Sequence, residues 1–290
     1  MAAKHIFFEI TDICNEDCVH CDKKWRKDGG HTMNQAMLDK ILAIPKESLT
    51  ISGGEPALAK KQVKYIIEKS SSPVSINTNL TLWNDEDFRL FKTRNTHLTV
   101  SVVSLNRDTY KRITGKDLVN KLKENLSKIN PFNSSITIIV NNYNMDELED
   151  MVNYLAVRSF NDFTIQPAIP GMGDKFNYDD YLKRLNALKN VYYKHRNINI
   201  ECMSYYDCSY GDLPVNHRCE AGTGRLVILS NGDIVPCACM APVIMGDIMK
   251  DTWDIIEAAG LKYFNSFQGI DRYTCKGFLS DETAKKERRC

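Results

Sequence analysis

Three cysteines near the start of the chain, Cys14, Cys18 and Cys21, have a spacing that suits metal chemistry. Thiolates in a C-x3-C-x2-C pattern on one short loop can converge on a single iron–sulfur cluster, but they supply only three of the four ligands that a closed site needs. An iron without a protein ligand can hold a substrate or a cofactor, so the pattern predicts a reactive metal site. A zinc site is the alternative, although ordinary zinc ribbons use paired C-x2-C units.

A second candidate binding segment contains Gly53, Gly54 and Glu55, followed by Pro56. Two glycines let a backbone approach a ligand closely, and a carboxylate beside them can accept a hydrogen bond from an ammonium group. The other interpretation is a glycine turn that leads into a helix with Pro56 at its first position. The segment alone fits either role, and the cysteines before it favour the binding role.

The remaining cysteines lie after residue 200 and are Cys202, Cys208, Cys219, Cys237, Cys239, Cys275 and Cys290. Between Cys219 and Cys237 the sequence predicts a hairpin, with a strand over 225–229 and a tight two-residue turn at Asn231-Gly232. Such a hairpin brings the thiols at its two ends to one edge, which predicts a second metal site. A structural zinc ion is the alternative occupant of that site.

Composition limits the possible class of protein. The chain has 290 residues, 43% of them hydrophobic, which suffices for one large α/β domain and a smaller appendage. Its net charge of +1 gives no electrostatic reason to expect nucleic acid or a membrane surface as a partner. No apolar run reaches the roughly 18 residues of a membrane span, and a signal peptide is not evident. We therefore expect a cytoplasmic protein whose ten cysteines serve metal or redox chemistry.

Strand-like and helix-like segments alternate along the first two thirds of the chain. This alternation predicts an α/β fold with a parallel sheet and right-handed crossovers, in which the cysteine loop and the glycine segment follow the first two strands. Reactive groups gather at the carboxyl ends of strands in barrels of this kind. The expected strands are 5–10, 49–52, 74–77, 97–103, 136–140 and 163–166, and the expected helices are 33–44, 58–70, 85–92, 118–129, 146–157 and 178–193.

The cysteine spacing and the Gly-Gly-Glu-Pro segment together resemble the radical S-adenosylmethionine (SAM) superfamily. The resemblance implies an open, partial (β/α)6 barrel over residues 1–200. It also implies a [4Fe–4S] cluster on Cys14, Cys18 and Cys21 whose open iron is chelated by SAM. One departure is His20, which stands before the third cysteine where the family usually has an aromatic residue and which can stack on adenine instead.

The same resemblance implies which residues contact SAM. Gly53, Gly54 and Glu55 would bind its amino group, and Asn79 matches the asparagine of a Thr-Asn-Gly turn in which Leu80 replaces the glycine. The segment 100–115 resembles the GTP-cyclising enzymes of molybdenum-cofactor synthesis, and Ser101 falls on their SAM-contacting serine, while Val103 replaces the usual aspartate. Gln166 and Asn141 are weaker cofactor or substrate candidates.

The C-terminal cysteines resemble the opening of the SPASM and twitch domains, C-x(9–15)-G-x4-C, with Gly232 as the motif glycine. The resemblance implies a short, cysteine-rich hairpin and helix domain over 201–290, twitch-like because cysteines for a second auxiliary cluster are absent. One auxiliary [4Fe–4S] cluster would be held by Cys219, Cys237 and Cys275. Its fourth ligand would be Cys290, Cys239, Cys208 or none. Cys239, if it is not a ligand, is a buried small residue or a hydrogen-atom donor. The predicted helix over 252–264 also fits this domain.

The function implied by the resemblance is that of a radical SAM oxidoreductase. Reductive cleavage of SAM would give a 5′-deoxyadenosyl radical that removes a substrate hydrogen atom, with a flavodoxin or ferredoxin as electron donor. The first interpretation of the substrate is a ribosomally made peptide that undergoes a net oxidation, although the chain begins almost at its first strand, without a leader-binding domain. The alternatives are a dehydrogenase, epimerase or isomerase of an aminosugar or nucleotide and a non-catalytic iron–sulfur protein. GTP cyclisation is disfavoured because the chain ends in Cys290 and not in Gly-Gly.

Overall fold

The computed structural model describes residues 5–21, 29–94, 96–168, 177–195, 198–202, 221–237 and 243–266. Its strands are β1 (His5–Thr11), β2 (Ser48–Gly53), β3 (Val74–Thr78), β4 (His97–Ser101), β5 (Ser134–Val140), β6 (Asp162–Pro167), β7 (Asn199–Cys202), β8 (Arg225–Ile228), β9 (Asp233–Val235) and β10 (Gly246–Asp247). Its α-helices are α1 (Gln35–Ala43), α2 (Lys60–Lys69), α3 (Asp85–Thr93), α4 (Arg107–Thr114), α5 (Val119–Leu126), α6 (Leu148–Ala156), α7 (Tyr178–Lys194) and α8 (Trp253–Asn265), with short 3-10 turns η2 (Pro56–Ala59), η3 (Pro131–Asn133) and η4 (Met145–Glu147).

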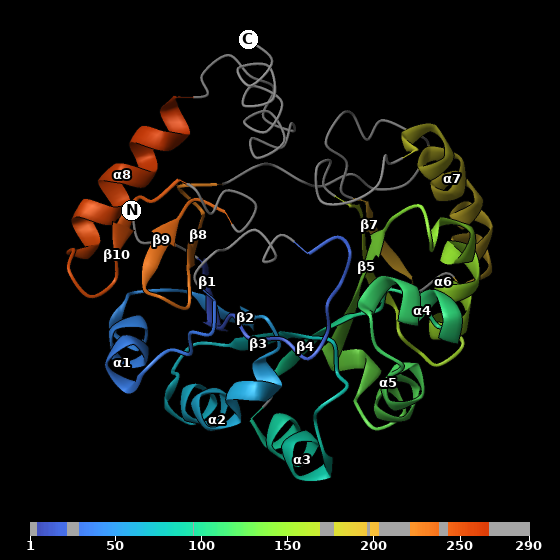
Figure 1. Ribbon diagram of the computed structural model, residues 1–290, viewed down its shortest axis with the longest axis horizontal. Coiled ribbons are helices and arrows are strands. Elements are labelled where there is room, and N and C mark those ends of the chain that lie inside the picture. Colours follow the sequence, from blue (N-terminus) through green and yellow to red (C-terminus); the bar gives the residue numbers. More distant parts are fainter. Residues whose placement is uncertain are drawn as a thin grey trace.

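The strands form one 10-stranded sheet in the order β10-β9-β8-β1-β2-β3-β4-β5-β6-β7. Neighbouring strands from β1 to β7 run parallel, and helices α1 to α7 lie on the outer side of the curved sheet (Figure 1). The six expected strand–helix units are present, and the expected α/β partial barrel is confirmed. The strand β7 was not expected, and it crosses the boundary that we predicted between residues 200 and 201.

The alternation of side chains along the strands separates an apolar outer face from a polar inner face. Ile6, Leu49, Ile76, Val100 and Ile138 are fully buried in the core under the helices. The opposite face of β2 to β6 consists largely of neutral polar residues, with Asp162 and Ile139 as exceptions. These residues are Ser48, Thr50, Ser52, Ser75, Asn77, His97, Thr99, Ser101, Ser135, Thr137, Thr164 and Gln166.

Asparagines mark the starts of several helices. Asn34, Asn84, Asn106 and Asn177 each accept a hydrogen bond from a backbone N–H in the first turn of α1, α3, α4 and α7, respectively. Such caps satisfy amide groups that have no partner inside the helix. Helix α4 was not expected from the sequence, because only Tyr110 and Ile113 give it a buried apolar stripe.

The β8–β9 hairpin extends the barrel sheet, because β8 pairs in parallel with β1 from His5 opposite Arg225 to Phe8 opposite Ile228. Its turn differs from the predicted two-residue Asn-Gly turn. The N–H of Gly232 donates to the carbonyl of Leu229 at 2.9 Å, so the central residues are Ser230 and Asn231, and Gly232 follows with φ 97°. The prediction was wrong because the left-handed conformation falls on the glycine alone, as in a type I turn followed by a bulge.

Candidate metal centre

The three N-terminal cysteines lie on the loop that follows β1, at the carboxyl ends of the parallel strands. Figure 1 shows this blue loop crossing the sheet toward α4. The N–H of Asp17 donates to the carbonyl of Thr114 at 2.8 Å, and the N–H of Val19 donates to that of Ile113 at 2.9 Å. The last turn of α4 therefore fixes the backbone on both sides of Cys18.

The two glycines of the second segment hold the other side of the loop. The N–H of Gly54 donates to the carbonyl of Thr11 at 2.7 Å, and that of Glu55 donates to Ile13 at 2.9 Å. A Cβ atom at Gly54 would lie 2.1 Å from the Ile13 oxygen, and one at Gly53 would lie 2.3 Å from the Thr11 oxygen. Their missing side chains thus make room for the cysteine loop. The close approach to a ligand that we expected from them stays a prediction.

Asp12, two residues before Cys14, connects the loop to the C-terminal hairpin. Its carboxylate accepts hydrogen bonds from the N–H groups of Gly30 and His31, both at 2.8 Å, from His31 Nδ1 at 3.1 Å and from Ser230 Oγ at 3.2 Å. Burial opposes ionisation of Asp12, but these donors hold its pKa below the usual value. The sequence analysis missed this residue, because its partners are distant in sequence.

The thiols sit in surroundings that do not favour thiolates without a cation. Cys14 is exposed, and Cys18 and Cys21 are half-buried. Burial, with nearby Glu55, Glu16 and Cys21, raises the pKa of Cys14 to about 11. Burial raises the pKa of Cys18 further, and the Glu16 carboxylate adds to this rise. Positive iron would stabilise the three thiolates, so the donor set fits an iron–sulfur cluster.

Among the residues that the structure describes, no three His, Cys, Asp or Glu side chains form a metal-binding group. The fit to a cluster therefore depends on the thiol donors, their spacing and the loop that β2 and α4 hold in place.

A buried pair beneath the loop reinforces its contact with α4. The Tyr110 hydroxyl, on a side chain that is 1% exposed, donates to Oε1 of Glu16, and Oε2 of Glu16 lies 3.6 Å from the sulfur of Cys18. Burial raises the pKa of Glu16, while the Tyr110 and Cys18 hydrogen bonds lower it. Tyr110 thus acts as a support for the cysteine loop that the sequence analysis did not identify.

Glu55 lies inside the fold beside the loop. It is 1% exposed and accepts hydrogen bonds from Thr78 Oγ1 at 2.7 Å, the N–H of Asn79 at 2.8 Å and the N–H of Ala57 at 3.0 Å. Burial raises its pKa to about 7, although the three donors oppose this rise. Glu55 therefore ties the end of β3 to the start of η2, and its role toward the SAM amino group stays a prediction.

The turn after β3 brings Asn79 to the cysteine loop. Its Nδ2 donates to Asn15 Oδ1 at 2.9 Å, and its Oδ1 accepts from Thr81 Oγ1 at 2.7 Å. The next residue, Leu80, is fully buried and has φ 64°, a left-handed conformation that disfavours a residue with a side chain. This is the position where the family resemblance placed a glycine, so the fold keeps the turn and buries a leucine in it.

Further predicted site residues gather at the same edge. Ser101 ends β4 on the inner face opposite Thr137, and Gln166 lies on the inner face of β6 opposite Ile139. The buried ring of His20 lies with Nδ1 3.4 Å from Nδ2 of Asn141, just after β5. The structure thus brings the candidates from β1, β3, β4, β5 and β6 to one rim.

Most of the predicted auxiliary ligands cannot be placed. Cys219, Cys239, Cys275 and Cys290 lie outside the described residues, as does Cys208. Cys237, which is half-buried, follows β9 at the end of the hairpin. The auxiliary ligand set therefore stays a prediction.

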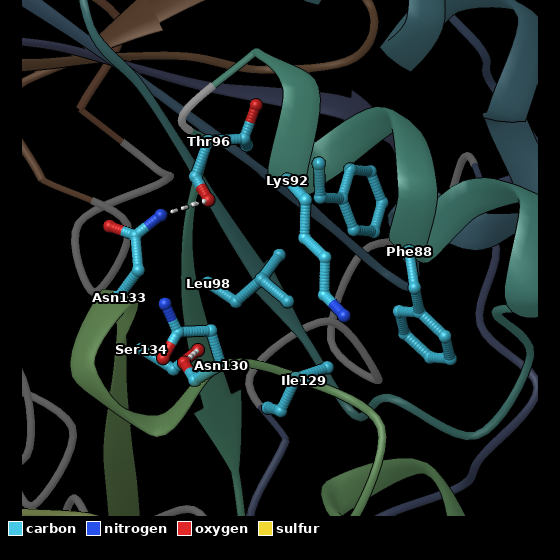
Figure 2. Close-up of a pocket in the computed structure, with 9 residues that line it drawn as sticks. Phe88, Lys92, Thr96, Leu98, Ile129, Asn130, Asn133 and Ser134 are labelled. Atoms are coloured by element: carbon cyan, nitrogen blue, oxygen red, sulfur yellow. Dashed lines mark hydrogen bonds between the residues drawn. The ribbon is translucent and has the colours of Figure 1, made fainter.

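A small pocket lies near the amino ends of β4 and β5, whereas the cysteine loop lies at the carboxyl ends of the strands. Figure 2 shows the residues that line this pocket. The pocket has a volume of about 150 Å³ and is lined by Phe88, Phe91, Lys92, Thr96, Leu98, Ile129, Asn130, Asn133 and Ser134. These residues come from the end of α3 and the starts of β4 and β5. Because no predicted site residue lines this pocket, the pocket is not part of the candidate metal centre.

The fold and the loop together define an open parallel barrel with a loop of three cysteines at the carboxyl ends of its strands. A family model described as the radical SAM superfamily matches residues 8–155, and one for an iron–sulfur cluster-binding domain, SPASM, matches 219–277. The chain belongs to the radical SAM superfamily. Its cofactors are SAM, a SAM-binding [4Fe–4S] cluster and an auxiliary cluster, as these two domains imply.

Individual relatives are distant. A GTP 3′,8-cyclase of Clostridium perfringens is 28% identical over 187 residues, which are 59% of this chain and 58% of that protein. Streptococcus suis SuiB bound to its precursor peptide SuiA has a similar structure, with TM-score 0.71 and 16% identity over 89% of this chain and 65% of that one. Native anSMEcpe with bound AdoMet gives TM-score 0.70 and 16% identity over 94% and 86%. The structural likenesses show the fold.

In the described part of the chain, no helix could cross a membrane.

Proposed function

We propose that this enzyme cleaves SAM reductively and uses the resulting 5′-deoxyadenosyl radical to remove a hydrogen atom from a polar substrate. The observation that carries this proposal is the clasp around the cysteine loop, in which Gly54 and Glu55 bind one side and α4 binds the other. The clasp presents three thiols at the open rim of the barrel. The cluster, when bound, supplies the electron that cleaves SAM.

The chain itself would position the reacting molecules. The carboxyl ends of β3, β4 and β6 carry Asn79, Ser101 and Gln166, which would orient SAM over the barrel opening. Holding the substrate beside the adenosyl carbon then provides the proximity on which radical transfer depends. The hydroxyl and amide groups of the inner face would supply hydrogen bonds to such a substrate.

The first candidate reaction is a net oxidation of a ribosomally made peptide. SuiB, which is similar in fold, has been seen with a precursor peptide. In this proposal an auxiliary cluster on Cys219, Cys237 and Cys275, with Cys290 as fourth ligand, accepts the electron that the substrate radical gives up when the oxidised product forms. A cytoplasmic location and a flavodoxin or ferredoxin electron donor belong to the same proposal.

The second candidate is a redox-neutral or oxidising reaction on a small polar molecule such as a nucleotide or an aminosugar. Two observations favour it. One curated relative is a GTP 3′,8-cyclase, and the inner face is rich in hydroxyl groups. The chain spans less than two thirds of that relative, so its activity is transferred here only as a hypothesis.

Mass spectrometry in deuterated water distinguishes the outcomes. The reconstituted enzyme would be given SAM, dithionite and, separately, GTP and the peptides encoded beside its gene. We expect a peptide product two hydrogens lighter, with one SAM consumed for each product. A product that keeps the substrate's composition apart from one deuterium taken up from the solvent, and that is absent with Cys239→Ala, would instead establish hydrogen return from Cys239.

A further inference from the structure

Positive charge is concentrated on one segment next to the cysteine loop. Residues 107–128, which contain α4 and α5, carry seven Lys or Arg and three Asp or Glu, whereas the whole chain has a net charge of only +1. The excess therefore belongs to a particular face of the molecule. Such a local field can steer a partner of opposite charge even when the whole protein is nearly neutral.

The acids of this segment are largely engaged by its own cations. Asp117 pairs with Arg107, and Glu124 pairs with Lys121 and Lys128. Lys111, Arg112 and Lys116 are exposed beyond these pairs. The Arg112 guanidinium lies 4.0 Å from the centre of the Tyr143 ring, which orients it without neutralising it. Three cations thus remain available on the surface at the end of α4.

This surface is the one that touches the cysteine loop. The carbonyl groups of Ile113 and Thr114 accept the N–H groups of Val19 and Asp17, the two neighbours of Cys18. Lys116 follows two residues after Thr114. Lys111 and Arg112 lie in the same last turn of α4, so a carrier docked on these cations would lie beside the cysteine loop.

Among the described residues of the cysteine loop and α4, few acidic side chains lie near this surface. Asp17 is exposed, and Glu16 is tied to Tyr110 and Cys18 beneath the loop. Asp108 lies at the other end of α4, in its first turn. The local charge at the end of α4 is therefore positive, and this surface suits an acidic partner.

We propose that Lys111, Arg112 and Lys116 form the docking surface for an acidic one-electron carrier of the flavodoxin or ferredoxin class. The inference rests on the proposed function, which needs one electron for each SAM that is cleaved. In the transfer, the reduced carrier loses one electron and the cluster on Cys14, Cys18 and Cys21 gains it. The three cations are not among the predicted cluster or SAM residues, so we expect them to affect binding of the carrier and not the later chemistry.

The test uses the double variant Lys111→Glu/Lys116→Glu of the reconstituted enzyme. Its matched control is Lys61→Glu/Lys64→Glu, which reverses two exposed charges on α2, a helix that α3 and α5 separate from α4 in Figure 1. Two readouts are compared: the Kd for FMN-loaded flavodoxin, and SAM cleavage driven either by reduced flavodoxin or by dithionite. Reversing two charges at an interface should raise the Kd about tenfold or more, and it should flatten the salt dependence of binding.

The expected pattern is a weaker flavodoxin complex and slower flavodoxin-driven cleavage in the α4 variant alone, with dithionite-driven cleavage within about twofold of the wild type. An unchanged Kd would contradict the proposed docking surface. An equal loss of SAM cleavage with dithionite and with flavodoxin would also contradict it, because the substitutions would then act on the fold. A raised KM for a peptide substrate with normal flavodoxin binding would assign the surface to the peptide. If the wild type cleaves no SAM with dithionite, the proposed function fails, whereas the Kd still decides the docking question.

Discussion

The two cysteine regions of this chain are held by different kinds of contact. The loop of Cys14, Cys18 and Cys21 is bound through backbone groups on both sides, at a distance from Gly53 and Gly54 that leaves no room for a side chain. Within the described residues, the hairpin that carries Cys237 is attached by the pairing of β8 with β1, by apolar side chains in the main core and, at its turn, by the hydrogen bond from Ser230 to Asp12. The first region should therefore tolerate little change, and the second should adapt locally.

The two faces of the hairpin pack differently. Val227, Leu229 and Val235 form a small apolar cluster with Phe7, whereas the other face contributes to the main core. The cysteine loop, in contrast, is surrounded by elements of the main core, including Tyr110 and Ile113. Damage to the loop contacts should thus spread to the barrel rim, while loss of the Ser230 hydrogen bond at the hairpin turn should stay local.

The largest effect is expected from Gly54→Ala. The new Cβ would lie 2.1 Å from the Ile13 oxygen and 2.8 Å from the Cys14 nitrogen, so the loop must move. We expect loss of the SAM-binding cluster, which is about half of the iron if both clusters are [4Fe–4S], and loss of SAM cleavage. Iron analysis and the yield of 5′-deoxyadenosine measure both. Gly29→Ala is the control, because its Cβ would meet nothing within 4 Å. Full iron content in Gly54→Ala would show that the clasp is dispensable.

Leu80 tests how much strain the neighbouring turn stores. Because the side chain is fully buried, Leu80→Ala should cost about 2–5 kcal/mol of unfolding free energy. Alanine, however, keeps the penalty of φ 64° that glycine avoids, so Leu80→Gly should be at least as stable as Leu80→Ala. At Leu38, a buried residue of α1, the order should reverse, with glycine less stable by about 1 kcal/mol. Denaturant unfolding measures the unfolding free energies of the four variants. If alanine were more stable than glycine at both positions, backbone strain at Leu80 would be excluded.

Glu55 gives the clasp a pH dependence. Its pKa is raised from 4.5 to about 7 in the folded protein, so the folded state keeps a proton that the unfolded state releases. Stability must then fall as the pH rises through this range. Between pH 6 and 8 the wild type should lose about 1 kcal/mol relative to Glu55→Gln, which has no such group. Unfolding curves of both proteins at the two pH values measure this, and a parallel pH response would contradict the shift.

The smallest effect is expected from Ser230→Ala, which removes the 3.2 Å hydrogen bond from the hairpin to Asp12. Asp12 keeps its bonds to Gly30 and His31, so the loss should be about 0.5–1 kcal/mol, with iron content and SAM cleavage unchanged. Hydrogen exchange of the hairpin amides detects such a local change. Loss of SAM cleavage in this variant would mean that the hairpin controls the cysteine loop, against the comparison made above.

The sequence predicted the elements that have a regular pattern and missed those that depend on tertiary contacts. The strand–helix units follow from apolar periodicity, and the cysteine loop and glycine segment follow from their positions after strands. Helix α4 has too short an apolar stripe to be recognised, and β7 has only 4 residues. The contact of Gly53 and Gly54 with Thr11 and Ile13 could not be inferred, because it depends on how the loop after β1 packs on the end of β2. The Asp12–Ser230 bond joins residues 218 positions apart, and no local pattern announces it.

The most direct test of the central claim is SAM cleavage by the anaerobically reconstituted wild type with dithionite, beside a Cys14→Ala/Cys18→Ala/Cys21→Ala variant. The wild type should form 5′-deoxyadenosine and methionine in equal amounts. The variant should retain about half of the iron, on the auxiliary cluster, and form neither product. A fully iron-loaded wild type that leaves SAM intact, or a variant that still cleaves it, would contradict the account.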